Sequence, residues 1–97
     1  MTKDIEMKLD QMTEMKRRKS EYIALKNKCK KMQESKIMTL GWEECNKLHG
    51  DSMQWMDIDE DAKKVVAIAL TEFCSRKMSE CEHELEKLLE ELKSLRS

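Results

Sequence analysis

The chain has 97 residues, and 40% of them are charged, against roughly 25% in ordinary globular domains. Proline is absent, glycine occurs twice and aromatic residues make up 4% of the chain, so the composition is typical of long helices with little apolar mass for a core. No apolar run approaches the roughly 20 residues of a membrane span, and no signal-peptide core is present.

We therefore expect a single helical domain over residues 1–97, in an intracellular protein of the cytoplasm or nucleus. The four cysteines, at positions 29, 45, 74 and 81, are not spaced like those of a small disulfide scaffold, which favours a reducing compartment. The net charge of −1 is unevenly distributed. Residues 1–42 carry 11 basic and 6 acidic residues, or +5, and residues 43–97 carry 8 and 14, or −6. Opposite charge favours packing of the two halves together.

The first predicted helix covers residues 3–38. Its apolar stripe begins with Ile5, Leu9 and Met12 and then moves by one residue. The second part of the stripe contains Met15, Tyr22, Leu25, Cys29 and Met32, with Arg18 falling among them. Such a shift indicates an insertion in a heptad pattern and is expected to disturb a supercoil locally.

Residues 39–56 are predicted to form a corner that contains a short helix. Gly50 suits the left-handed position that ends a helix. Trp42 and Trp55 lie on the two sides of this break and are expected to meet across it, either as corner packing or as an aromatic anchor for a partner. Met53 and Met56, beside Trp55, offer soft and adaptable contact surfaces.

The second predicted helix covers residues 57–95, with Asp57 as its N-cap and Glu60 three residues later. The run from Val65 to Leu70 is apolar on every side, which is typical of a buried helix. A strand is the alternative for this run, but the helical pattern continues on both sides of it. A single neighbouring helix covers one side only, so a partner is expected to cover the rest.

A heptad seam follows without interruption in the second helix. It consists of Cys74, Met78, Cys81, Leu85, Leu88, Leu92 and Leu95. A seam of this kind packs against another helix. Leu89 widens the apolar face, which favours a bundle of three or four helices.

Charges beside the two stripes have opposite signs. Lys19, Lys26 and Lys28 border the first stripe, with Glu21 as the exception. Glu82, Glu84 and Glu91 border the second, with Lys77 and Arg96 as the exceptions. This pattern favours an antiparallel pairing of the two helices within one chain. The alternative is a parallel homodimer through residues 74–95, in which Cys74 and Cys81 face their own copies and cross-link on oxidation.

The predicted fold class is therefore all-α, an elongated antiparallel helical hairpin or coiled coil completed to a three- or four-helix bundle by oligomerisation or a partner. The predicted function is that of a non-enzymatic protein-interaction subunit or scaffold that binds itself or another helical subunit. A charge at Leu70 or Leu88 is expected to abolish assembly. The predicted contact residues are Trp42, Trp55, Val65, Val66, Ile68, Leu70, Phe73, Cys74, Met78, Cys81, Leu85, Leu88, Leu89, Leu92 and Leu95.

The alternative function is nucleic-acid binding by the basic part of the first helix, between Lys16 and Lys36. The candidate residues are Lys16, Arg17, Arg18, Lys19, Lys26, Lys28, Lys30 and Lys31. Basic helices contact phosphates, but no base-reading motif is visible in this one.

Catalytic, metal and cofactor sites are not predicted. Cys45 and His49 lie one helical turn apart in the predicted corner helix, as zinc ligands can, but no second pair converges on them. The sequence has no Gly-rich phosphate loop, nucleophile elbow or HExxH motif, so an enzyme is not predicted.

Overall fold

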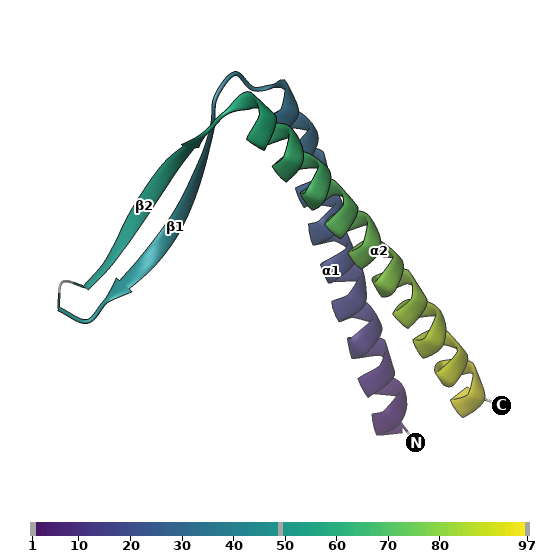
Figure 1. Cartoon of the computed structure of the whole chain (residues 1–97). Helices are drawn as coiled ribbons and strands as arrows, with labels where there is room; N and C mark the ends of the chain where they lie inside the picture. Colours follow the sequence, from purple (N-terminus) through teal and green to yellow (C-terminus); the bar gives the residue numbers. More distant parts are fainter. Residues whose placement is uncertain (1, 49, 97) are drawn as a thin grey trace.

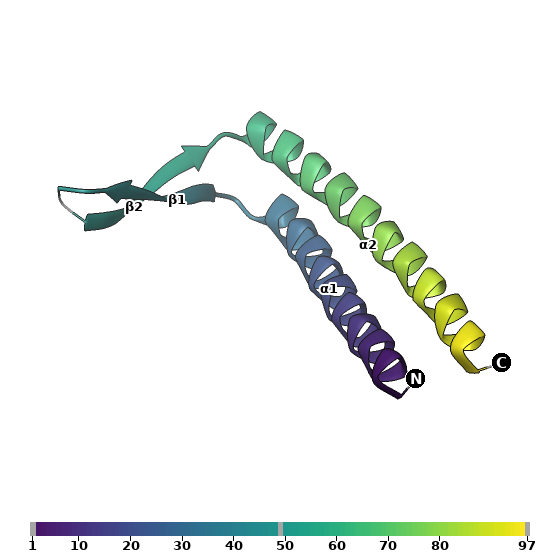
Figure 2. The same ribbon diagram turned by 90° about the horizontal axis from the view of Figure 1, so that it is seen from below.

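The computed structural model describes residues 2–48 and 50–96. Its elements are helix α1 (Thr2–Glu34), strand β1 (Met38–Asn46), strand β2 (Gly50–Ile58) and helix α2 (Glu60–Arg96). The helices lie side by side and antiparallel, and the two strands form a hairpin that projects from one end of the helical pair (Figures 1 and 2). Both ends of the chain lie at the opposite end of that pair (Figure 1). The molecule measures 57 × 38 × 14 Å and is therefore thin.

The prediction of two long helices is confirmed, but the prediction of a purely helical chain is wrong. Residues 38–58 form an antiparallel two-stranded sheet instead of a corner with a short helix. Apolar side chains alternate with other residues at Met38, Leu40 and Trp42, and again at Met56 and Ile58. This period of two matches a strand, in which successive side chains point to opposite faces.

The hairpin closes at Gly50, whose φ of 78° lies in the left-handed region. Glycine adopts this conformation without steric cost, so the sequence prediction of a left-handed residue here is correct although it ends no helix. Trp42 pairs with Gln54, and Trp55 pairs with Gly41. The two tryptophans therefore lie on opposite faces of the sheet, and the expectation that they meet is wrong.

The core of the molecule lies between α1 and α2. On α2 it consists of the buried residues Ala67, Cys74, Cys81, Leu88 and Leu92, and on α1 Cys29 is buried. The first four positions on α2 are seven residues apart, so the predicted heptad seam extends back to Ala67 and packs on α1. Cys74 and Cys81, which the alternative of a parallel homodimer would place against their own copies, are buried in this intramolecular contact.

Charge pairing agrees with the predicted antiparallel orientation of the helices. Lys19 Nζ lies 3.0 Å from Glu82 Oε1, and Lys8 forms an ion pair and hydrogen bond with Glu91. Leu9, by contrast, is 47% exposed. The predicted stripe of Ile5, Leu9 and Met12 is therefore wrong at Leu9, because Lys8 is the residue that reaches α2 there.

A buried lysine joins the helices where the hairpin begins. Lys63 Nζ donates a hydrogen bond of 2.7 Å to the carbonyl oxygen of Ser35 and lies 2.9 Å from Glu60 Oε2.

The α2 helix is capped by Asp59, whose Oδ1 accepts a hydrogen bond of 2.8 Å from the backbone N–H of Ala62. The cap is therefore Asp59 and not the predicted Asp57, because the strand continues to residue 58.

Candidate protein-interaction site

One face of the hairpin is apolar in the half that lies nearest the helices. This Trp42 face has Met38, Leu40, Trp42, Met56 and Ile58 in that half, and the strand register adds Gln54, Ser52 and Glu44 toward the turn. Met38 is buried next to the helices, whereas Trp42 is 44% and Met56 50% exposed. Isolated exposed apolar residues are ordinary on protein surfaces, but a contiguous apolar patch is typical of an interaction site.

The opposite face carries the second tryptophan. This Trp55 face consists of Thr39, Gly41, Glu43, Cys45, Asp51, Met53, Trp55 and Asp57. The Trp55 ring lies over Gly41, so closely that a Cβ added to Gly41 would lie 2.5 Å from ring atom Cζ3. Glycine therefore provides the space for the ring, whose outer side remains open because Trp55 is 64% exposed.

The outer edges of both strands are open within the part of the chain that the structure describes. The sheet contains only β1 and β2, each nine residues long. Their outward N–H and C=O groups have no neighbouring strand, and the chain contains no proline to interrupt an edge. Such edges pair readily with strands of other chains. A two-stranded hairpin is also marginally stable by itself, so a partner would stabilise it.

The contact residues predicted on α2 separate into two groups. Cys74, Cys81, Leu88 and Leu92 are buried, and Val66, Leu70, Phe73, Met78, Leu85 and Leu95 are half-buried. These positions lie on the face of α2 that packs on α1. Phe73 is an example, because its ring lies edge-on to the ring of Tyr22 with 6.0 Å between the ring centroids. The other group consists of Val65, Ile68 and Leu89, which are exposed.

The structure adds Leu40 to the candidate site, a residue that the sequence interpretation did not select. Met53 and Met56, for which the sequence suggests a role as contact surfaces, are both exposed on the hairpin. The signal that finds Leu40 is the alternation of apolar residues from Met38 to Trp42, which is typical of a strand and not of the predicted helix. The predicted contact residues Trp42 and Trp55 are both exposed, and they belong to two different faces of the hairpin.

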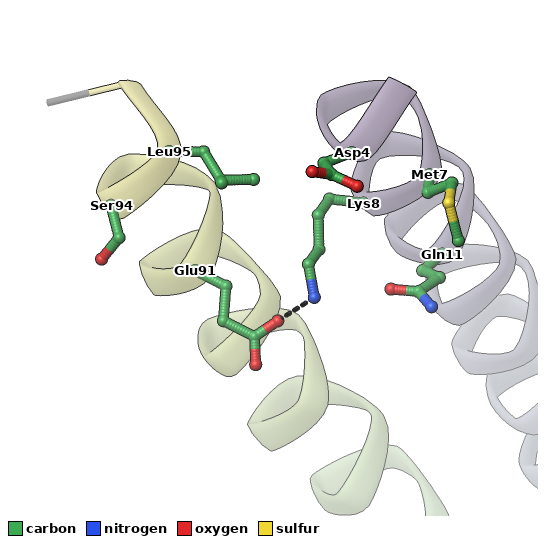
Figure 3. Close-up of a pocket in the computed structure, with 7 residues that line it drawn as sticks. All are labelled: Asp4, Met7, Lys8, Gln11, Glu91, Ser94 and Leu95. Carbon is green, nitrogen blue, oxygen red and sulfur yellow. Dashed lines mark hydrogen bonds and ion pairs between the residues drawn. The ribbon is translucent and has the colours of Figure 1, made fainter. Parts of the chain in front are cut away.

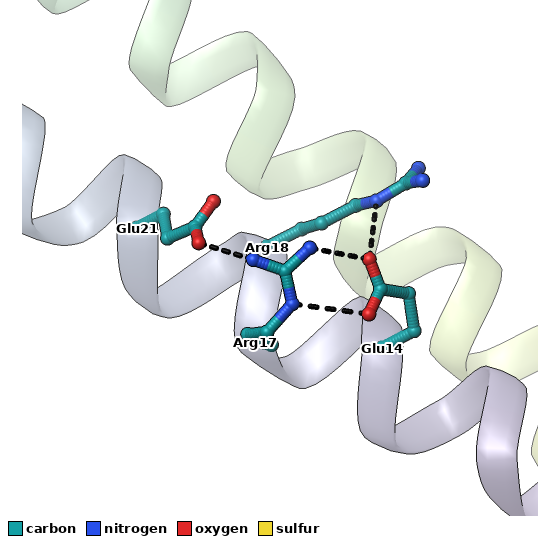
Figure 4. A network of polar contacts seen from close by, with 4 residues as sticks. All are labelled: Glu14, Arg17, Arg18 and Glu21. Carbon is teal, nitrogen blue, oxygen red and sulfur yellow. Dashed lines mark hydrogen bonds and ion pairs between the residues drawn. The ribbon is translucent and has the colours of Figure 1, made fainter.

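Acidic neighbours offset part of the basic cluster on α1 (Figure 4). Arg17 Nε donates a hydrogen bond of 3.0 Å to Glu14, and Arg17 also pairs with Glu21. Arg18 Nε lies 3.3 Å from the same Glu14 carboxylate. Hydrogen bonding from Arg17, with its positive charge, lowers the pKa of Glu14 to about 2. Glu14 is thus ionised at neutral pH and reduces the local positive charge.

Only part of the cluster points freely into solvent. Lys19 is engaged by Glu82 on α2, and Lys26 is half-buried. Lys16, Lys28, Lys30 and Lys31 are exposed. A phosphate backbone would therefore meet fewer available charges than the eight candidate residues suggest.

A hollow of about 390 Å³ lies between the free ends of the helices (Figure 3). Lys8 from α1 reaches across it to Glu91 on α2, and Met7 and Leu95 contribute apolar surface. The hydrogen bond from Lys8 holds the pKa of Glu91 below its ordinary value. The hollow is therefore a gap between helix ends that an ion pair bridges.

The remaining candidate residues lie apart from these surfaces. Cys45 is exposed in β1, and its predicted companion His49 lies outside the described residues. Within residues 2–48 and 50–96, no three His, Cys, Asp or Glu side chains are grouped as metal ligands would be. Neither of the described helices is apolar enough over a sufficient length to cross a bilayer.

The hairpin thus combines exposed apolar side chains on both faces with open strand edges, and it projects away from the core between the helices. Comparisons with protein-family models, curated protein sequences and solved structures returned no match.

Proposed function

We propose that the protein is a non-enzymatic interaction subunit that joins other subunits of an assembly through the hairpin Met38–Ile58. The observation that carries this proposal is the exposure of Leu40, Trp42 and Met56 on one face of a sheet whose edges are open. Covering that face removes apolar area from water, and pairing an edge satisfies backbone groups.

The coiled coil acts as a semi-rigid arm in this proposal. Its heptad seam is already occupied, since Cys74, Cys81 and Leu88 are buried within the chain. Helix pairing within one chain therefore covers the heptad seam but not the outer side of the run from Val65 to Leu70. Val65 and Ile68 remain exposed near the hairpin and offer a smaller surface for a third or fourth helix.

Co-purification with the tagged full chain tests the proposal. The double variant Trp42→Ser/Met56→Ser removes the two large side chains at the centre of the Trp42 face. We expect it to lose stoichiometric partner subunits, as measured by quantitative mass spectrometry of the purified complex. Ile23→Ser is the matched control, because Ile23 is an exposed apolar residue on α1.

Circular dichroism of each variant checks that both helices are retained. Loss of partners in the hairpin variant alone supports the proposal. Equal retention of partners by both variants would show that the hairpin is not the site of assembly.

A further inference from the structure

The hairpin carries a net negative charge that its own residues do not offset. Positions 38–58 contain four acidic residues, Glu43, Glu44, Asp51 and Asp57, and one basic residue, Lys47, so the net charge is −3 with His49 neutral. All five of these charged side chains are exposed.

Ion pairing differs between the helices and the hairpin. The helices pair acidic with basic side chains, as in Lys19–Glu82 and Arg17–Glu14. Among the described residues, no lysine or arginine forms an ion pair with a hairpin carboxylate. Glu44 accepts a hydrogen bond of 3.2 Å from the indole N–H of Trp42, which is a neutral donor.

The strand register places these charges next to the apolar surface. Glu43, Asp51 and Asp57 share a side of the sheet with Trp55, and Glu44 lies two residues beyond Trp42 on the other side. A strand added to either edge therefore comes close to carboxylates as well as to the apolar side chains. Opposite charges across neighbouring strands stabilise pairing, and like charges oppose it.

We infer that the strand docking on this hairpin is basic and belongs to a different polypeptide, so that the assembly is hetero-oligomeric; this inference rests on the function proposed above. A second copy of the same hairpin would place two hairpins with a net charge of −3 each against one another at the contact. Like-charge contacts of this kind disfavour a wrong partner while leaving a complementary one unaffected.

The basic part of α1 in a second copy is a weaker match for the hairpin. Lys28, Lys30 and Lys31 are exposed there. They lie on a helix, however, whose backbone groups are already hydrogen-bonded along α1. A helix face offers charge but cannot extend a sheet edge, whereas a basic strand offers both.

The test uses a charge-reversed copy of the same full chain. The triple variant Glu43→Lys/Asp51→Lys/Asp57→Lys changes the hairpin from −3 to +3, since each substitution adds two charges. Wild-type and variant chains are measured alone and mixed, by sedimentation velocity at low and high salt. We expect the mixture to associate about tenfold more tightly than either chain alone at low salt, with the difference shrinking as salt screens the charges.

Two further variants keep the test decisive if the charge-reversed hairpin does not fold. The neutral variant Glu43→Gln/Asp51→Asn/Asp57→Asn is expected to self-associate more tightly than the wild type, because the mutual repulsion is reduced. Asp10→Lys/Glu72→Lys/Glu86→Lys adds the same charge at exposed helix positions and is expected to show no preference for the wild type.

The inference would be overturned if the wild-type chain associated with itself as tightly as the two chains associate in the mixture. It would also be overturned if the neutral variant associated with itself no more tightly than the wild type does. These results concern the charge of the partner only. The proposed function fails separately, if Trp42→Ser/Met56→Ser leaves partner recovery unchanged in the co-purification experiment.

Discussion

The coiled coil and the hairpin use their apolar residues in opposite ways. In the coiled coil, Cys74 and Leu88 are buried and the flanking charges pair between helices. In the hairpin, Trp42, Trp55 and Met56 are exposed, and no lysine or arginine among the described residues forms an ion pair with a hairpin carboxylate. The heptad seam of the first region is covered within one chain, whereas these apolar side chains of the second region are not.

Geometry explains this difference. An amphipathic helix has one apolar stripe, so one antiparallel neighbour is enough to cover it. A two-stranded sheet has two faces and two edges, and the described hairpin packs on the helices only near Met38. In a molecule 14 Å across its shortest dimension, no other layer is available to cover the rest.

The strongest way to break this comparison is a charge in the coiled-coil core. Leu88→Glu places a carboxylate at a buried position opposite α1, and we expect a loss of roughly 3–5 kcal/mol of folding free energy. The sequence alone predicts an effect of this change on assembly, but the burial of Leu88 within the chain makes folding its first effect. Thermal unfolding followed by circular dichroism measures it.

The neighbouring leucine provides the control. Leu89 is exposed on the same helix, so Leu89→Glu is expected to change stability by roughly 0.5 kcal/mol or less. Similar destabilisation by both substitutions would contradict the assignment of the inner and outer faces of α2.

A smaller change confined to the hairpin separates the two regions. Gly41→Ala places a methyl group where the Trp55 ring lies. We expect the ring to be displaced, with a local cost of roughly 1 kcal/mol, and the helices to be unaffected. Tryptophan fluorescence reports the displacement, and circular dichroism at 222 nm reports the helices.

The double variant Gly41→Ala/Trp55→Ala tests the cause. Removing the ring removes the clash, so adding Gly41→Ala to Trp55→Ala should cost less than adding it to the wild type. Independent effects of the two substitutions would mean that the ring and the glycine are not in contact.

The smallest expected effect is a pH dependence of the coiled coil. Lys8 holds the pKa of Glu91 below its ordinary value of 4.5, so this carboxylate stabilises the fold above pH 4.5 and loses that contribution as pH falls through the lowered pKa. We expect the melting temperature of Glu91→Gln to fall less than that of the wild type over this acidic range. Glu86→Gln, an exposed position, should follow the wild type.

Much of the coiled coil could be predicted from the sequence. Heptad spacing from Cys74 to Leu95 and the opposite charges at Lys19 and Glu82 are patterns along the chain that specify a helical contact and its direction. The candidate site was only partly predictable. The sequence indicates Trp42 and Trp55 as contact residues, but their opposite faces follow from a strand register that a helical interpretation of residues 39–56 does not contain.

The sequence by itself determined two long antiparallel helices, because helix propensity, heptad period and flanking charge act between near neighbours or repeat along a stripe. Tertiary structure decided the hairpin, because its strand conformation depends on pairing residues such as Met38 and Ile58, twenty positions apart, against the local helix preference of Met, Glu and Lys. Tertiary structure also decided which apolar residues remain exposed. Leu88 is buried and Trp42 is exposed because of the elements that pack together, and not because of the hydrophobicity of either side chain.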